Sequence, residues 1–175
     1  MALTLQSNGK IIYGGLNVSP KPSADLMRKT TGFSGDADPV INWARQSDAP
    51  FSGLPWSGMS ESSGVWTFPD TGIWLVSFHR EAYLNGDDRE VRVFIRGSTD
   101  NFSSVENLAE AATHIQQTES SNTHASVETS ALVDVTNTSN VKVRFKVTCN
   151  NSSTNTIGSS SSNRTYAQFI RIGDT

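Results

Sequence analysis

The sequence predicts an all-β fold, a sandwich or a barrel, and three observations lead to this prediction. Short runs rich in Val, Ile, Phe and Trp are separated by clusters of Gly, Asn, Asp and Ser, as expected for strands joined by turns. Several runs alternate apolar and polar residues, which is the period of a strand with one buried face. No segment shows a strong helical pattern, and 175 residues are enough for one domain with a real core.

The first 35 residues are predicted to form an arm that is separate from the main domain, which spans residues 36–175. Asn8-Gly9 stands between Leu3-Thr4-Leu5 and Ile11-Ile12-Tyr13, and Asn-Gly between two apolar runs is a strong β-hairpin signal. The rest of the arm is loop-like, because it holds two prolines and several Ser, Thr and Gly. We expect the arm to attach to another protein or to interlock with other copies through Leu3, Leu5, Ile11, Ile12 and Tyr13.

Candidate strands follow one another closely from residue 39 onward. Pro69 to Gly72 and Asn85-Gly86 are turn signals that separate them. Residues 104–117 are ambiguous, because their apolar residues also fit a helical spacing, and residues 150–163 are so rich in Ser, Thr and Asn that we expect an exposed loop. The candidate strands are residues 40–45, 65–68, 73–80, 91–96, 130–135, 141–147 and 165–172.

The alternation within these strands divides them into two kinds. Residues 91–96 and 141–147 mostly alternate apolar and charged side chains, as expected for one face in the core and one in water. The opposite sheet of a sandwich covers only one face of the remaining strands, and no strong helix is available to cover the other. We therefore expect an oligomer in which one whole sheet is buried between copies. The strands that are apolar on both faces are residues 40–45, 73–78, 130–135 and 166–172.

Residues 64–79 carry a resemblance to the C1q/tumour-necrosis-factor-like (TNF-like) jelly-roll family. They read Gly-Val-Trp-Thr-Phe-Pro-Asp-Thr-Gly-Ile-Trp-Leu-Val-Ser-Phe-His, which is similar to the family's pattern of glycine, aromatic, Thr, Pro, Gly, aromatic and a strand ending in Phe and His. Residues 131–135 and 141–147 resemble the family's late hairpin, and residues 166–172 resemble its last strand. The resemblance covers roughly residues 39–175.

The resemblance implies ten short strands in a two-sheet jelly-roll sandwich and a compact homotrimer. In that fold the first, third, sixth and last main strands form the inner sheet at the trimer interface, and these correspond to the strands that are apolar on both faces. The trimer interface is therefore expected to include Ile41, Trp43, Ile73, Leu75, Leu132, Tyr166 and Phe169.

The sequence differs from the family's usual setting behind a collagen stalk or a membrane anchor. It has no Gly-X-Y repeat and no membrane-length apolar run, and residues 1–10 lead us to expect no signal peptide. Jelly rolls of this type are known among tailed-phage structural proteins. By this analogy of fold we expect a non-enzymatic, homotrimeric virion protein, assembled in the host cytoplasm.

Within this class we favour a capsid decoration, or cement, protein that binds the major capsid protein or another virion protein through the arm. The alternatives are a receptor- or glycan-binding tip of a phage tail or head fibre, with a host surface glycan as partner, and a C1q-like secreted binding module. The sequence does not decide between a capsid position and a tail or fibre position.

No residue pattern favours catalysis or a cofactor, and we expect neither. The lone Cys149 excludes intrachain disulfides and multi-cysteine zinc sites, and the 25 serines include no nucleophile elbow. Asp87-Asp88 either binds calcium or consists of solvated turn residues, and we favour the second interpretation. A net charge of −3 without Lys/Arg clusters argues against a nucleic-acid partner, and no membrane partner is expected.

Overall fold

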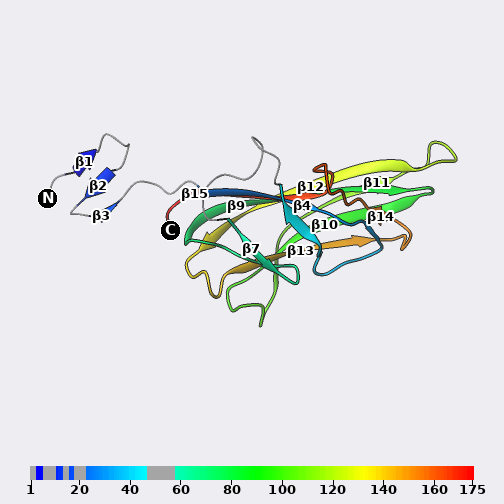
Figure 1. The fold of residues 1–175 in the computed structure, drawn as a ribbon. Helices are drawn as coiled ribbons and strands as arrows, with labels where there is room; N and C mark the ends of the chain where they lie inside the picture. Colours follow the sequence, from blue (N-terminus) through cyan, green and yellow to red (C-terminus); the bar gives the residue numbers. More distant parts are fainter. Residues whose placement is uncertain (1–2, 6–10, 14–15, 18–22, 47–57) are drawn as a thin grey trace.

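The computed structural model describes residues 3–5, 11–13, 16–17, 23–46 and 58–175. Two β-sheets pack face to face in the main domain, and a small separate sheet precedes them (Figure 1). The described residues contain strands, turns and bends but no helix. The all-β, two-sheet prediction is therefore confirmed. The described part of the chain accordingly offers no helix that is long and apolar enough to span a membrane.

The larger sheet has seven strands. β9 lies at its centre and pairs on one side with β12 and on the other with β15 and β14, while β4 pairs with β15 and β6, and β5 pairs with β14. The strands are β4 (Ser23–Lys29), β5 (Phe33–Ser34), β6 (Trp43–Arg45), β9 (Gly72–Leu84), β12 (Thr123–Val135), β14 (Asn155–Thr156) and β15 (Tyr166–Gly173).

The smaller sheet has five strands in the order β11-β10-β13-β8-β7, all antiparallel. Its strands are β7 (Ser60–Ser62), β8 (Val65–Thr67), β10 (Asp88–Ser98), β11 (Glu106–Ile115) and β13 (Lys142–Cys149). The β7–β8 turn uses Ser63 and Gly64, whose φ angles of 51° and 81° are the left-handed pair that suits a two-residue hairpin. A Cβ at position 64 would also lie 2.6 Å from the Cβ of Pro39, which explains the glycine.

An aromatic cluster fills the space between the two sheets. Trp66 from the smaller sheet lies with its ring centroid 5.1 Å from that of Phe169 in the larger one, and Phe78 lies 4.6 Å from Phe145 across the same gap. These four side chains are completely buried. As the alternation predicted, Val93 and Ile95 of β10 and Val143, Phe145 and Val147 of β13 point into this core. Phe94 is the exception to the alternation, and it lies on the outer side with the ammonium group of Lys146 5.2 Å from its ring centroid.

The predicted boundary of the arm at residue 35 is too late. β4 pairs with β15 over six residues and with β6 over three, so it belongs to the larger sheet, and β5 pairs with β14. β4 was missed because its sequence, SADLMRK, is mostly polar. Asp25 is nevertheless buried, since Arg45 of β6 donates to both of its carboxylate oxygens at 2.9 and 2.6 Å.

Two further expectations change at the level of elements. Of residues 40–45, only Trp43–Arg45 forms a strand, β6, and it lies beyond β4 on the sheet. Residues 104–117, which were ambiguous, contain strand β11 instead of a helix. β11 pairs with β10 along nearly its whole length, so its backbone forms hydrogen bonds within the sheet. This tertiary pairing outweighs the helical spacing of its apolar residues.

The three strands nearest the N-terminus form a sheet of their own. β1 (Leu3–Leu5) pairs antiparallel with β2 (Ile11–Tyr13), as the hairpin prediction requires, and β2 pairs with β3 (Leu16–Asn17). The Asn8-Gly9 turn on which that prediction rests lies outside the described residues.

Candidate functional site

One face of the larger sheet packs against the core. No other sheet of the described chain packs against its second face (Figure 1). We call the second one the open face. Successive residues of a strand point to opposite sides, so the register of β4, β15, β9 and β12 sorts the residues of this face into cross-strand rows. The rows differ in chemistry along the sheet.

The first of these, which we call the apolar row, consists of Ala24, Ile170, Leu75 and Leu132, one from each of β4, β15, β9 and β12. Leu132 is 65% exposed, and the other three are half-buried. Ile172 of β15, which is 56% exposed, and Ile73 of β9 extend the same end of the sheet. A single exposed apolar side chain on a protein surface is ordinary, but a row of them across four strands is typical of a protein interface.

A second row, which we call the ionic row, crosses the same strands four residues further along. It consists of Arg28, Tyr166, His79 and Glu128. The His79 and Tyr166 rings are stacked, with centroids 4.8 Å apart and planes at 16°. Nδ1 of His79 lies 2.8 Å from the carbonyl oxygen of Arg164, which can only accept, so this nitrogen carries the proton.

Residues 158–165 cover part of the ionic end of the face. Arg28 donates to the carbonyl of Ser160 at 2.9 Å, and Arg164 donates from Nε to Glu81 at 2.7 Å. This hydrogen bond from Arg164 lowers the pKa of Glu81, although burial opposes it. Burial, together with the charge of Glu128, raises the pKa of Tyr166. The ionic end is therefore already engaged within one copy, whereas Leu132 of the apolar row stays exposed among the residues that the structure describes.

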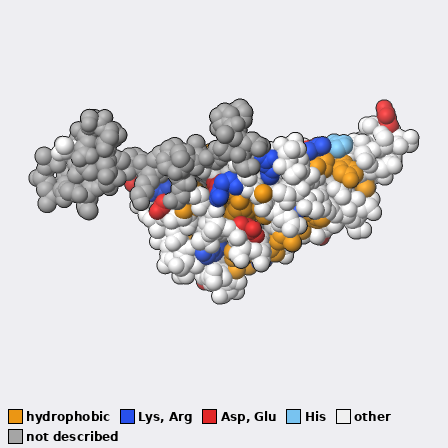
Figure 2. Space-filling view, in the orientation of Figure 1, with side chains coloured by type: hydrophobic (Ala, Val, Ile, Leu, Met, Phe, Trp, Pro, Cys, Tyr) orange, Lys and Arg blue, Asp and Glu red, His pale blue; other side chains and the backbone are white. Residues whose placement is uncertain are grey.

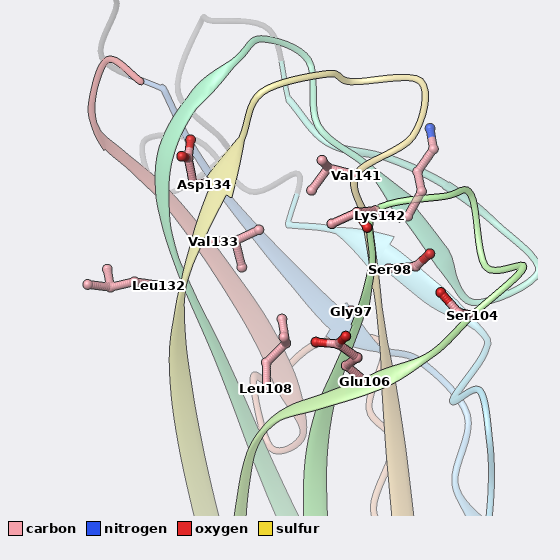
Figure 3. A pocket seen from close by; sticks show the side chains of 11 residues that line it. Gly97, Ser98, Ser104, Glu106, Leu108, Leu132, Val133, Asp134, Val141 and Lys142 are labelled. Carbon is pink, nitrogen blue, oxygen red and sulfur yellow. The ribbon is translucent and has the colours of Figure 1, made fainter.

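A pocket of about 170 Å³ opens beside the apolar row, where β12 of the larger sheet and β10–β11 of the smaller sheet diverge. Leu108, Leu132 and Val133 all line it, and Figure 3 shows the Val133 and Leu132 side chains leaving β12 on opposite sides. A Cβ on Gly97 would lie 2.6 Å from Leu108, so glycine allows Leu108 to lie against the β10 backbone.

The acidic pair at the far end of the sandwich is not free to bind an ion. Asp88 is buried and accepts hydrogen bonds from Oγ1 of Thr154 and from the backbone amides of Glu90, Asn150 and Asn151, the latter three at 3.1 to 3.3 Å. Its exposed neighbour Asp87 accepts from the amide of Gln117. Within the described ranges, no three His, Cys, Asp or Glu side chains lie together in a way that could hold a metal ion.

Cys149 lies at the end of β13, partly buried beside Asp36. Burial raises the pKa of its thiol, and the carboxylate of Asp36 adds to this effect. A thiol with a raised pKa is a poor nucleophile, so the geometry gives Cys149 a packing role.

The structure separates the predicted interface residues into groups. Leu75 and Leu132 are direct cross-strand partners on the open face, with Ile73 next to them and Tyr166 in the ionic row. Ile41 precedes β6 and is 47% exposed.

Two of the predicted interface residues point toward the core. Phe169 is completely buried, and Trp43 packs with its ring centroid 5.7 Å from both Trp66 and Phe145, so both side chains serve the core. The alternation of side chains along a strand, which we call parity, gives the reason for Phe169. Positions 166 and 169 are three apart on one strand, so they cannot share a face. The same parity identifies Ile170 and Leu26, which the prediction missed, as open-face residues.

Comparisons with known proteins support the fold. The structure of Eiger TNF from S. frugiperda matches with a TM-score of 0.63 at 16% identity, covering 88% of this chain and 94% of that one. Murine APRIL at pH 5.0 matches with a TM-score of 0.59 at 13% identity, covering 87% of this chain and all of the other, and murine APRIL at pH 8.0 gives 0.55 at 15% identity with the same coverage. No family model and no curated protein matches the sequence. The domain thus has a TNF-like jelly-roll fold.

Proposed function

We propose that this chain is a non-enzymatic interaction protein that assembles as a homotrimer through its open face. The observation that carries the proposal is the apolar row, which crosses four strands and ends in Leu132, 65% exposed. Burial of apolar surface contributes about 25 cal/mol per Å², so covering this row favours association. The match to TNF-like folds supports three copies, since the family resemblance places this sheet at a trimer interface.

Within this class we propose a virion structural protein of a tailed phage, in the role of a capsid decoration protein. The surface chemistry supports exposure to the medium, because Ser, Thr and Asn make up 55 of 175 residues while charged residues are only 18%. On the face that Figure 2 shows, most of the described surface is neutral, with a few charged side chains. The small sheet of β1, β2 and β3 supports a separate attachment element at the N-terminal end.

A second candidate is a receptor- or glycan-binding tip, and one observation favours it. Polar loops from three parts of the chain meet at the end of the sandwich that is remote from the start of β4. Gln117 donates through its side chain to Asn85 at 2.7 Å, and Asn151 donates to the carbonyl of Asp87 at 3.4 Å. A molecule attached by its arm would present these amide groups outward, and amides suit the hydroxyls of a sugar.

The decisive experiment for the homotrimer is Leu132→Asp, measured by light scattering. The wild type is expected at three times 19.0 kDa, and the variant is expected to be monomeric at micromolar concentration with an unchanged far-UV circular dichroism spectrum. Ala112→Asp is the matched control. Ala112 is exposed and pairs with Arg92 on the outer side of the smaller sheet, so it should leave the trimer intact. A monomeric wild type would overturn the proposal.

A further inference from the structure

The strand pair β10–β11 contains a β-bulge at the far end of the sandwich, where the acidic pair and the polar loops lie. The register between the two strands shifts there by one residue, so Arg89 and Glu90 of β10 lie opposite the single residue His114 of β11. A bulge bends its strand and re-aims the side chains on it, and bulges are common beside functional sites. Arg89 therefore departs from the regular alternation of β10.

An open pocket of about 310 Å³ lies at this bulge. Its base is apolar, because Ile115 is 2% exposed and belongs to a small cluster of buried hydrophobic residues. Most of the remaining lining is polar and exposed. The volume is near the lower end of the range of about 300–1,000 Å³ that is typical of small-molecule sites, so it suits one sugar unit. The lining residues are Asp87, Asp88, Arg89, His114, Ile115 and Gln116.

Hydrogen bonds within the chain hold the acidic side of the pocket in place. The buried carboxylate of Asp88 accepts from groups of residues 150–154. Oδ1 of Asp87 accepts from the amide of Gln117 at 2.7 Å, and the side chain of Gln117 donates to Asn85 at 2.7 Å. A site that is ordered before binding loses less conformational entropy when its ligand arrives. This side of the pocket is therefore preorganised.

Three polar side chains of the pocket, those of Arg89, His114 and Gln116, form no hydrogen bond or ion pair with any residue that the structure describes. Glu90, the acidic neighbour of Arg89, pairs with Arg92 instead. A guanidinium group presents a planar fork of donors that matches a carboxylate, and an amide group both donates and accepts. The pocket thus offers an unused anion-binding group beside groups that suit hydroxyls.

We propose that this pocket binds a sugar that carries a carboxylate, with Arg89 on the carboxylate and with Asp87 and Gln116 on the hydroxyls. The inference deepens the second candidate function, the glycan-binding tip, and rests on it. The carboxylate of Asp87 places a negative charge in the pocket, so a singly charged carboxylate fits better than a doubly charged phosphate. The proposed homotrimer holds three such pockets, and simultaneous binding of one polysaccharide strengthens a weak affinity for each unit.

Glucuronate and glucose are matched probes, because they differ only at carbon 6, which is a carboxylate in the first and a hydroxymethyl group in the second. Saturation-transfer difference NMR with the full chain measures the Kd of each, since this method detects weak ligands of large proteins. Arg89→Gln removes the proposed carboxylate partner. Lys146→Gln is the matched control, because it also removes one positive charge from the smaller sheet but lies outside the pocket. Far-UV circular dichroism and light scattering check the fold and the oligomeric state of both variants.

We expect a millimolar Kd for glucuronate and binding of glucose that is weaker by about tenfold or more. Arg89→Gln should weaken glucuronate binding by about tenfold or more, because a charge-assisted hydrogen bond is lost. Lys146→Gln should change it by less than about twofold, because salt screens distant exposed charges.

Equal binding of the two sugars, or equal effects of the two variants, would overturn the assignment of a carboxylate to Arg89 and leave the glycan-binding function standing. No saturable binding of either sugar would overturn the pocket and count against the glycan-binding tip as well. The homotrimer is judged separately, from the light scattering of the same samples.

Discussion

Lys29 shows how a single buried charge makes stability depend on pH. Its side chain is 1% exposed, its ammonium group donates to the carbonyl of Ile41 at 2.7 Å, and it lies 4.9 Å from the ring centroid of Phe33. No carboxylate in the described residues forms an ion pair with it. Burial therefore lowers its pKa from 10.5 to about 8.

Lys29→Met tests this assignment. Between about pH 8 and pH 10.5 the folded protein releases a proton that the unfolded chain keeps, so the wild type gains stability as pH rises through this window. Methionine does not titrate. The free energy of unfolding of the wild type minus that of the variant should therefore rise by about 2–3 kcal/mol between pH 7.5 and 10.5. Urea unfolding at both pH values measures it, and a difference that does not change with pH would contradict the prediction.

Side-chain parity assigns the residues of a strand to its two faces, and the sequence analysis applied it to some strands but not to others. Residues 73–78 were assigned correctly, with Trp74 and Phe78 buried and Ile73 and Leu75 outward. Phe169 was placed at the interface because the whole strand is apolar, although its parity opposes that of Tyr166. Hydrophobicity indicates that a strand is covered on both faces, whereas only parity and register indicate which residue faces which partner.

At the scale of elements, a buried polar network joins β9, β10 and the loop before β14. Arg80 of β9 is completely buried and donates from Nε to Oγ1 of Thr156 at 2.9 Å and from one terminal nitrogen to the carbonyls of Arg92 and Thr148. Asp88, at the start of β10, accepts from the backbone of the loop. The network lies near a small apolar cluster of Ala82, Leu84, Val91 and Ile115 and ties the loop to the strands, so these elements depend on one another.

Asp88→Asn is expected to loosen that end of the molecule. An asparagine amide presents a donor to groups that already donate, and it removes the buried negative charge near Arg80. We expect a loss of about 2–3 kcal/mol in the free energy of unfolding. Faster amide hydrogen exchange should appear in residues 150–156. The adjacent Asp87→Asn, at an exposed position, is the control and should cost less than about 1 kcal/mol. Equal losses in the two variants would count against the network.

Strands with strong apolar alternation could be predicted from the sequence. A strand whose buried polar side chains form hydrogen bonds with distant parts of the chain could not. β8, β9, β10 and β13 were found at nearly their observed positions. β4 was not, because Asp25 and Lys29 are neutralised or hydrogen-bonded by Arg45 and the Ile41 carbonyl, which are 20 and 12 residues away in the chain. Such compensation depends on tertiary contacts that no local pattern records.

At the scale of the whole molecule, the position of the true domain boundary can be tested by two deletions. A variant that lacks residues 1–22 keeps every strand of both sheets of the sandwich and should fold with nearly unchanged far-UV circular dichroism. A variant that lacks residues 1–35 loses β4 and β5, leaves the β15 edge unpaired and deprives Arg45 of Asp25. We expect it to be insoluble or unfolded. A folded second variant would restore the boundary at residue 35.

The shorter deletion also tests the proposed place of the molecule in a virion. Removing residues 1–22 takes away the small sheet of β1, β2 and β3 but leaves the apolar row, so light scattering should still report a trimer. In co-sedimentation with phage particles assembled without the protein, the wild type should bind and the truncated trimer should not, because the attachment element is missing. The copy number of the bound wild type then separates the two candidate roles: copies spread over the shell indicate capsid decoration, whereas a few copies at one site indicate a fibre tip. A truncated trimer that still binds particles would assign attachment to the sandwich and contradict the role of the arm.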